Sequence, residues 1–386
     1  MRIGIVTLPL HTNYGGILQA FALQTVLKRL GHDAKVINLN RKPTKLSHAK
    51  KLKFFIRRVL STIKHMRVFG TYCLTKLQQD NYAKFAIKTQ NTQKFVDKYI
   101  DCFYVNSYRK DIKPSDFDAF VVGSDQIWSN YHGTAIDGSV VNAFLPFITK
   151  RGIIKLSYAA SFGKDNWEYT KTETQLAQKA VKAFKAVSVR EHSGINLCKQ
   201  YLDVTAQQHL DPTMLLDMQD YIDAINIANV APSPGNLLVY IIDSNTEKQQ
   251  MVECVEKILA LTKFAVNSRA EDTNLKNIGI EQCIQPPVEQ WLRGFYDAKF
   301  VITDSFHACV FSILFHKPFI AIGNAERGMA RFQSLLEQFD LADRLIINLP
   351  QLQQFNLSAP INFAAIDAKL NAERERATTY LKQNLS

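Results

Sequence analysis

The sequence predicts two α/β domains, each built on a doubly wound parallel sheet, with a cleft between them. The chain has 386 residues, which is the size of two ordinary domains. Short apolar runs alternate with amphipathic segments on both sides of a Pro- and Gly-bearing stretch at 231–236. Hydrophobic residues make up 46% and charged residues 21%, a globular composition that excludes a largely disordered chain.

The N-terminal domain is expected over residues 1–230. An apolar run at 3–7 is followed by an amphipathic helix at 15–30, which Gly31 ends, and by a second apolar run at 34–39. Strand, helix and strand at this spacing form a βαβ unit, in which the strands pair in parallel. The same reasoning predicts strands at 119–122, 156–160 and 186–189, and helices at 76–99 and 172–183.

The C-terminal domain is expected over residues 236–360, after the linker. It alternates in the same way, with predicted strands at 237–242, 264–266, 300–303 and 318–322 and predicted helices at 248–261, 288–298 and 309–315. Residues 361–386 form a further helix, which we expect to pack back on the N-terminal domain. In such folds ligands bind in the crevice outside the carboxyl ends of the strands.

The net charge of +12 arises from one segment. Eleven Lys or Arg and no Asp or Glu lie between Arg41 and Gln79, leaving 36 basic and 35 acidic residues elsewhere. Apolar residues recur there at helical spacing, so about 41–79 is predicted to be a basic amphipathic helical insertion. Such a helix suits an anionic membrane surface, or it packs on the body with its basic face in solvent. Since no nucleic-acid-binding module accompanies the charge, we expect no nucleic-acid partner.

The six cysteines are scattered, with no CxxC pair, which favours free thiols in a reducing compartment and no zinc site. The histidines show no metal-ligand spacing, so no metal is expected. Pro9 breaks the first apolar run, which therefore does not resemble a signal peptide, and the longest apolar stretch, 300–322, carries charged residues. We expect a cytoplasmic protein, or one bound peripherally to the inner face of the membrane.

Two loops that follow predicted strands near the N-terminus carry candidate ligand-binding residues. Glycines at 15 and 16 open a helix, where an anion or sugar can approach backbone N–H groups, although a plain tight turn explains them as well. The run GSDQIW occupies 123–128. Asp125 is a candidate base or hydroxyl-orienting group and Trp128 a candidate sugar-stacking platform; the alternative is that Ser124 or Asp125 only caps a helix.

Two later strand ends carry candidates for binding and proton transfer. Arg190 offers a planar fork for a carboxylate or phosphate, unless it only neighbours Glu191 at the surface. His307 follows a predicted buried strand beside Asp304, and an imidazole there can donate or accept a proton near pH 7. Arg327 and Arg331 lie on the following Gly-bearing loop as candidate anion clamps.

Six short motifs together resemble the polysaccharide pyruvyl transferase family. They are Asn13-Tyr14-Gly15 with Leu18-Gln19, GSDQIW at 123–128, YAASFG at 158–163, SVRE at 188–191, LDPT at 210–213 and TDSFHA at 303–308. They span roughly residues 1–345 in the family's order. The resemblance implies a fold like that of GT-B glycosyltransferases, with two Rossmann-like domains facing a cleft. It also implies phosphoenolpyruvate as donor, no separate cofactor, and a hydroxyl pair of a cell-surface polysaccharide or its lipid-linked precursor as acceptor, giving a pyruvate ketal.

The resemblance also implies roles for particular residues. His307 matches the candidate acid of the family and Arg190 a donor-binding arginine, while Ser305 stands where relatives carry an arginine and Ala308 where they usually carry glycine. We expect Asp125 or Asp304 to act as base or orienter, and Arg327 or Arg331 to supply the charge missing at Ser305. The acceptor is expected to contact Asn13, Tyr14, Gly15, Gln19, Ser124 and Trp128.

Two other functions remain compatible with the sequence. A GT-B glycosyltransferase that uses a sugar nucleotide would share the fold and the anion sites at helix N-termini. A non-catalytic glycan- or membrane-binding relative of the enzyme would bind the acceptor without releasing phosphate.

Overall fold

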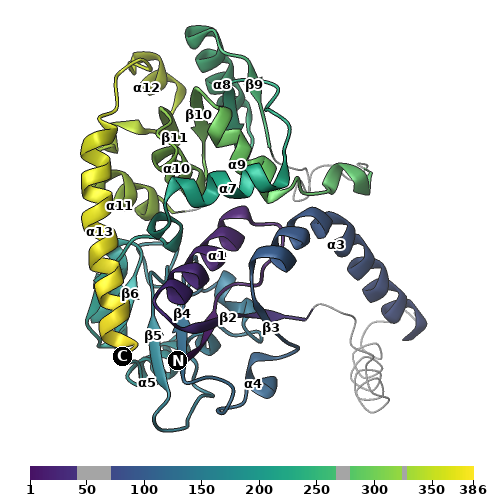
Figure 1. The fold of residues 1–386 in the computed structure, drawn as a ribbon, viewed down its shortest axis with the longest axis vertical. Helices are drawn as coiled ribbons and strands as arrows, with labels where there is room; N and C mark the ends of the chain where they lie inside the picture. The colour runs from purple at the N-terminus through teal and green to yellow at the C-terminus, as the bar shows by residue number, and fades with distance from the viewer. Residues whose placement is uncertain (41–70, 267–278, 324–327) are drawn as a thin grey trace.

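A computed structural model of the chain describes residues 1–40, 71–266, 279–323 and 328–386. Within these residues two five-stranded parallel sheets form two Rossmann-like domains, one above the other in Figure 1, so the predicted α/β fold class is confirmed. The proposed insertion at about 41–79 lies mostly outside the described residues; helix α3 (Thr71–Tyr99) covers its end. Among the described helices, none combines the length and the apolar character that a membrane span requires.

The N-terminal sheet has the strand order β3-β2-β1-β4-β5. Its middle strand, β1, lies between β2 and β4, and α1 connects β1 to β2 on one face. Two short parallel strands, β6 and β7, continue beside β5 through isolated bridges. The strands are β1 (Arg2–Val6), β2 (Asp33–Leu39), β3 (Cys102–Val105), β4 (Ala119–Val122), β5 (Ile154–Ser157), β6 (Val187–Val189) and β7 (Ala206–Gln208). The helices are α1 (Tyr14–Arg29), α4 (Tyr108–Asp111), α5 (Lys171–Val181) and α6 (His192–Leu197), with shorter turns at His132–Ala135, Val140–Phe144, Cys198–Leu202 and Pro212–Leu215.

The C-terminal sheet has the strand order β12-β11-β10-β8-β9. Its middle strand, β10, is buried along its whole length and leads directly into α10. The strands are β8 (Leu237–Tyr240), β9 (Lys263–Phe264), β10 (Phe300–Thr303), β11 (Phe319–Ile322) and β12 (Leu345–Ile346). The helices are α8 (Thr246–Leu259), α9 (Val288–Asp297), α10 (Phe306–Leu314), α11 (Ala330–Gln338) and α12 (Leu349–Gln354), with short turns at Ile280–Cys283 and Ala342–Arg344.

The chain crosses between the domains in two places. Helix α7 (Met218–Ala228) precedes the predicted linker, yet it packs on α9 and α10 of the upper domain, where the Tyr221 ring meets Phe311 edge-on. Helix α13 (Phe363–Asn384) then runs down the side of both domains in Figure 1. Tyr380 on α13 donates to the carbonyl of Ser157 at 2.9 Å, and Arg374 donates to the carbonyl of Met214 at 2.7 Å.

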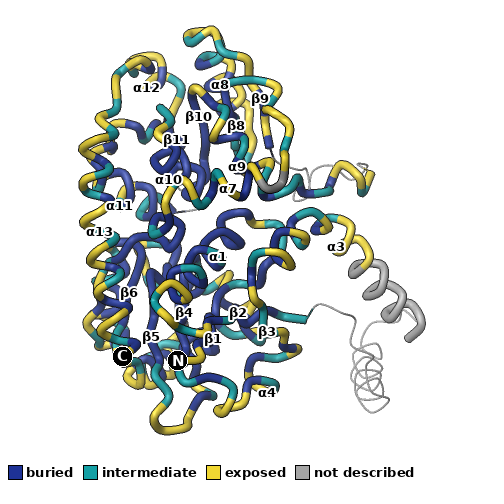
Figure 2. The backbone as a smooth tube through the Cα atoms, viewed as in Figure 1, coloured by how far each residue is buried: buried dark blue, intermediate teal, exposed yellow. Residues whose placement is uncertain are grey.

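The apolar core continues across the domain interface. Figure 2 shows buried backbone in both sheets and in the helices between them, and one cluster of buried side chains extends from β1 and α1 to α9 and α10. Tyr14, at the start of α1, stacks on Trp291 with ring centroids 5.3 Å apart and donates to the carbonyl of Pro286 at 2.8 Å. Burial of such large aromatic groups stabilises the contact between the domains.

Candidate active site

The N-terminal end of α10 enters the N-terminal domain. Strand β10 ends at Thr303, and Ser305 caps α10, its hydroxyl oxygen accepting from the Ala308 N–H at 3.5 Å. Phe306 and His307 therefore occupy the first turn of the helix, where both are buried against the other domain. The strand-to-helix turn thus carries an imidazole from one domain into the other.

His307 and Arg190 meet at a third residue, Asp211. Arg190 follows β6, and its Nη1 donates to Oδ2 of Asp211 at 2.7 Å. The Nε2 atom of His307 lies 3.5 Å from the same oxygen. The side chains of all three are at most 8% exposed. Burial opposes ionisation of Asp211, but the neighbouring His307 and Arg190 hold its pKa well below its usual range.

Asp125 lies on the other side of Arg190. Its Oδ1 is 3.6 Å from Nη2 of Arg190, and its Oδ2 accepts from Nδ2 of Asn13 at 3.3 Å. Burial opposes ionisation here too, but His307, Arg190 and Arg331 outweigh it, so the pKa of Asp125 is lowered. Asp125 is therefore held as a carboxylate beside Arg190.

Supporting contacts fix the loop that carries Asp125. The backbone N–H of Ser124 donates to Oε1 of Gln19 at 3.0 Å, and the Ser124 hydroxyl donates to the carbonyl of Ala159 at 2.6 Å. Asp125 itself has a φ of 53°, in the left-handed region that non-glycine residues rarely adopt. Gln19 and Ser124 thus position Asp125, which we find a better account of them than direct contact with an acceptor.

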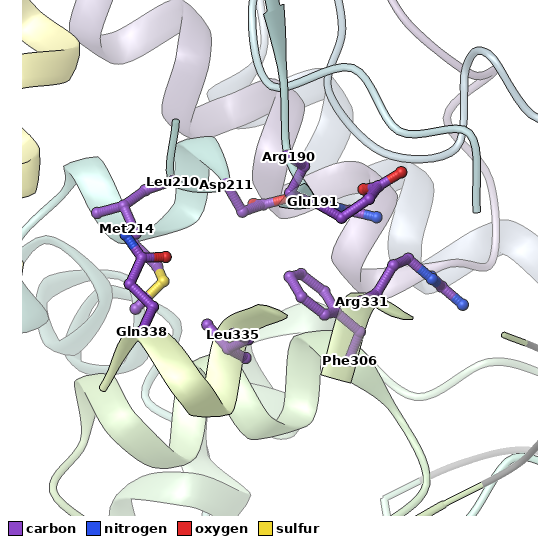
Figure 3. Close-up of a pocket in the computed structure, with 9 residues that line it drawn as sticks. All are labelled: Arg190, Glu191, Leu210, Asp211, Met214, Phe306, Arg331, Leu335 and Gln338. Carbon is purple, nitrogen blue, oxygen red and sulfur yellow. The ribbon is translucent and has the colours of Figure 1, made fainter. Parts of the chain in front are cut away.

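A small hollow lies between the domains at this point (Figure 3). Side chains of both domains line it: Arg190, Glu191, Leu210, Asp211, Met214, Phe306, Arg331, Leu335 and Gln338. The ring of Phe306 lies 4.2 Å from the guanidinium carbon of Arg190, a cation–π contact. The hollow has room for about one water molecule.

Several buried nitrogen atoms of Arg190, which lines the hollow, and of the neighbouring His307 have no hydrogen-bond partner among the described residues. They are Nε and Nη2 of Arg190 and Nε2 of His307. A buried donor without a partner is costly, and a guanidinium fork is well matched to carboxylate or phosphate oxygens. The arrangement therefore suits a small anion.

Asp304 lies apart from this group. Its carboxylate accepts from Nζ of Lys248 at 2.6 Å and from the N–H groups of Ile242 and Asp243 at 2.7 and 3.1 Å. These partners belong to its own domain, and they occupy both of its oxygens. This placement argues against Asp304 as the base that we expected beside His307. Of the two candidate arginines downstream, Arg331 lines the hollow, and Arg327 lies outside the described residues.

Two aromatic acceptor candidates are buried in the core. Trp128 is fully buried, stacked on Phe144 at 4.7 Å between ring centroids and tilted against Phe162. Because both of its faces are covered, the structure contradicts the expectation that Trp128 stacks on a sugar. Tyr14 is equally buried at the interface between the domains and is not placed to contact an acceptor.

Gly15 has a closer relation to the site than the sequence indicated. A Cβ atom at this position would lie 2.0 Å from Nδ1 of His307 and 2.2 Å from its Cγ. The imidazole therefore packs directly on the backbone of the first turn of α1. Only a residue without a side chain leaves this space.

The sequence reasoning missed Asp211 and Phe306 as members of the site. Asp211 follows β7, and Arg190 follows the neighbouring parallel strand β6. Since parallel strands bring the residues that follow them to the same edge, this pairing could have placed Asp211 beside Arg190. Phe306 had no such signal, because an apolar residue beside His307 is equally typical of a buried helix. In the described part of the chain, no group of three His, Cys, Asp or Glu side chains is placed to hold a metal ion.

Comparison with known proteins bears on both the family and the fold. The family model described as polysaccharide pyruvyl transferase matches residues 13–326. No curated protein matches the chain. Among solved structures, the UDP-GlcNAc 2-epimerase of Methanocaldococcus jannaschii is 13% identical, with a TM-score of 0.51 over 98% of this chain and 100% of that one. At this identity the likeness concerns the fold alone, and it agrees with the GT-B-like arrangement of two Rossmann-like domains.

Two further solved structures cover nearly the whole chain with lower scores. The UDP-GlcNAc 2-epimerase of Neisseria meningitidis, bound to UDP-GlcNAc, is 8% identical, with a TM-score of 0.46 over 100% of this chain and 99% of that one. The Escherichia coli heptosyltransferase WaaC with ADP is 11% identical, with a TM-score of 0.36 over 97% and 100%.

Proposed function

The chain belongs to the polysaccharide pyruvyl transferase family, and we propose that it transfers pyruvate from phosphoenolpyruvate to a hydroxyl pair, forming a pyruvate ketal. The acceptor is a cell-surface polysaccharide or its lipid-linked precursor. One observation carries the proposal: His307 and Arg190 come from opposite domains and reach the same oxygen of Asp211. A proton donor and an anion-binding fork thus face each other across the cleft, as this chemistry requires.

The donor carries a carboxylate and a phosphate, and both need cationic partners. Nε and Nη2 of Arg190 are the donors that remain for one of them, and Arg331 approaches the same hollow from α11. Since the hollow holds about one water molecule, the domains must stand further apart than in this structure to hold phosphoenolpyruvate. Closure then places the first turn of α10 over the donor and excludes water.

His307 acts as the general acid. It protonates the methylene carbon C3 of the enol phosphate, and positive charge develops at C2. The carboxylate of Asp125, held ionised by its cationic neighbours, stabilises that charge and orients the first hydroxyl. As this hydroxyl bonds to C2 it becomes strongly acidic, so even a weak base such as Asp125 accepts its proton.

The second half of the reaction closes the ring. The C2–O bond to phosphate breaks, and the second hydroxyl of the acceptor adds to C2. Of the two hydroxyl protons lost, one restores the protonated His307 and the other leaves with inorganic phosphate. The products are one pyruvate ketal and one phosphate for each phosphoenolpyruvate.

A phosphate-release assay tests the proposal. Phosphoenolpyruvate is supplied with a panel of lipid-linked galactose- and mannosamine-type acceptors, and phosphate is measured together with ketal formation. We expect equal amounts of both with at least one acceptor. Stabilisation against heat by UDP or GDP sugars, but not by phosphoenolpyruvate, would instead favour a glycosyltransferase.

A matched pair of histidine variants tests the role of His307. His307→Ala should abolish phosphate release while the protein remains folded. His192→Ala removes an exposed imidazole at the start of α6 and should leave turnover within about twofold of wild type. Near-normal turnover of His307→Ala would refute the assignment.

We also propose that the basic segment at 41–79 holds the enzyme at the cytoplasmic leaflet, where a lipid-linked acceptor would lie. Its eleven Lys and Arg residues favour anionic lipid. Cosedimentation with liposomes should therefore rise with the fraction of anionic lipid and fall with added salt. Binding that is independent of lipid charge would reject this role.

A further inference from the structure

We propose that Asp211 is a positioning residue for His307, so that closure of the two domains completes the proton donor. The proposal rests on the function proposed above, in which His307 protonates the donor. Asp211 belongs to the N-terminal domain and His307 to the C-terminal domain, so the pair exists only when the cleft is closed.

The carboxylate of Asp211 is oriented by its own segment. Asp211 caps the short helix Pro212–Leu215, and its Oδ1 accepts from the Thr213 N–H at 3.1 Å and from the Thr213 hydroxyl at 2.8 Å. Its side chain is fully buried. One oxygen is thus committed within the N-terminal domain, and the other, Oδ2, faces His307.

Oδ2 is the oxygen that the other groups approach. Nη1 of Arg190 lies 2.7 Å away, the Ser124 hydroxyl 3.3 Å and Nε2 of His307 3.5 Å. The distance to His307 is long for a hydrogen bond, so Asp211 acts on the ring through its charge and leaves the Nε2 proton free. Nε2 of His307 has no hydrogen-bond partner among the described residues, and it is the nitrogen that can turn to a bound donor because Nδ1 packs on Gly15.

The opposite edge of the imidazole is held as well. Its Nδ1, Cγ and Cε1 atoms pack on Gly15. The ring therefore lies between the backbone of α1 and the Asp211 carboxylate, and each limits its rotation. A carboxylate beside a catalytic imidazole favours its cationic, proton-donating form.

The charged groups around His307 come from several elements. The carboxylates are Asp211, after β7, and Asp125, after β4; the cations are Arg190, after β6, and Arg331, on α11. Asp211 is the carboxylate that lies within 4 Å of the imidazole. Its removal should therefore be the substitution that most disfavours the protonated ring.

Asp211→Asn tests the proposal through the pH profile. The amide keeps the size of the side chain but loses its charge. We expect kcat to fall at least about tenfold, and the alkaline limb of the pH profile to move down by about one pH unit or more, with a smaller change in KM for phosphoenolpyruvate. Asp203→Asn, on an exposed carboxylate of the same domain, should behave as wild type.

Three outcomes would overturn the proposal. If Asp211 served only to hold Arg190, the variant would raise KM for phosphoenolpyruvate and leave the alkaline limb in place. Thr213→Val keeps the charge of Asp211 and removes the hydroxyl that orients its carboxylate. The kcat should therefore fall several-fold while the alkaline limb of the pH profile stays in place. An unchanged kcat would count against a positioning role for Asp211. If the wild-type protein releases no phosphate, the proposed function and this inference both fail. If the wild-type protein is active but Asp211→Asn leaves the alkaline limb of its pH profile in place, the inference alone fails.

Discussion

The contact between Gly15 and His307 gives a sharp test of the closed site. In Gly15→Ala, the added Cβ would lie 2.0 Å from Nδ1, 2.2 Å from Cγ and 2.6 Å from Cε1, whereas ordinary contacts begin near 3.4 Å. The imidazole must therefore move by about 1.4 Å. Cγ joins the imidazole to the rest of the His307 side chain, so a rotation of the ring about its own plane does not relieve this contact. The whole ring must swing away from Gly15, or the two domains must part.

The expected loss of activity follows from that displacement. Moving a catalytic group by about 1 Å can lower the rate about 100-fold, and either response takes His307 from Asp211. The substitution should not harm α1, because Gly15 is helical without a positive φ and alanine favours helix by up to about 1 kcal/mol over glycine. We expect kcat for phosphate release to fall about 100-fold while the N-terminal domain remains folded.

Gly16→Ala is the matched control. It makes the same change one residue later, but the nearest atom to its Cβ is Nδ2 of Asn13 at 3.3 Å, so a shift of a few tenths of an ångström accommodates it. Phosphate release and thermal unfolding should be measured for both variants. A Gly15→Ala enzyme with activity within twofold of wild type, or equal losses in the two variants, would show that His307 does not pack on Gly15.

Three further predictions concern stability. Because Trp128 packs in the core, Trp128→Phe should lower the free energy of unfolding by about 1–3 kcal/mol in urea titrations and leave KM for the acceptor unchanged. A selective rise in that KM would show that Trp128 does bind the acceptor sugar. Asp304→Asn leaves buried Lys248 without its carboxylate and should lower the free energy of unfolding by about 3–5 kcal/mol. The double variant Lys248→Met/Asp304→Asn should recover much of this loss, and equal losses in both variants would argue against the buried charge as the cause. Burial, with the charge of Arg376, lowers the pKa of His209 to about 4. Between about pH 6.5 and 4 the unfolded chain therefore binds a proton that the folded chain does not, and the free energy of unfolding should fall by about 3 kcal/mol as the pH decreases over this range. In unfolding experiments across the same range, His209→Asn should show a smaller dependence of stability on pH.

The fold was largely predictable because its signals are local. Apolar runs with helices between them indicated both sheets, and Gly31 marked the end of α1 within two residues. The helix after β10 was expected from 309 but begins at Phe306, because Ser305 caps it earlier than the apolar pattern indicated. Strand ends located Arg190 and Asp125 in the N-terminal domain and His307 in the C-terminal domain, since ligand-binding residues in such folds follow the carboxyl ends of the strands.

The partners of these residues were not predictable, because they depend on contacts between distant segments. Asp304 stands three residues from His307 in the chain, yet the turn after β10 directs it to Lys248, and Asp211 reaches the imidazole instead. Trp128 was a candidate sugar-stacking platform, but Phe144 and Phe162 cover it from other segments. Spacing in a sequence specifies which edge a residue occupies and not which neighbour it meets.

The two chain crossings between the domains lie side by side. Arg374 on α13 joins them, donating to the carbonyl of Met214 and to the Asp217 carboxylate at 2.9 Å, just before α7 begins. The domains are therefore tied together at this seam. Elsewhere on the interface, Gly163 and Gly328 approach so closely that a Cβ on Gly328 would lie 2.3 Å from the Gly163 carbonyl oxygen. A side chain at position 328 would wedge the two domains apart at that point, so their close approach there depends on a glycine.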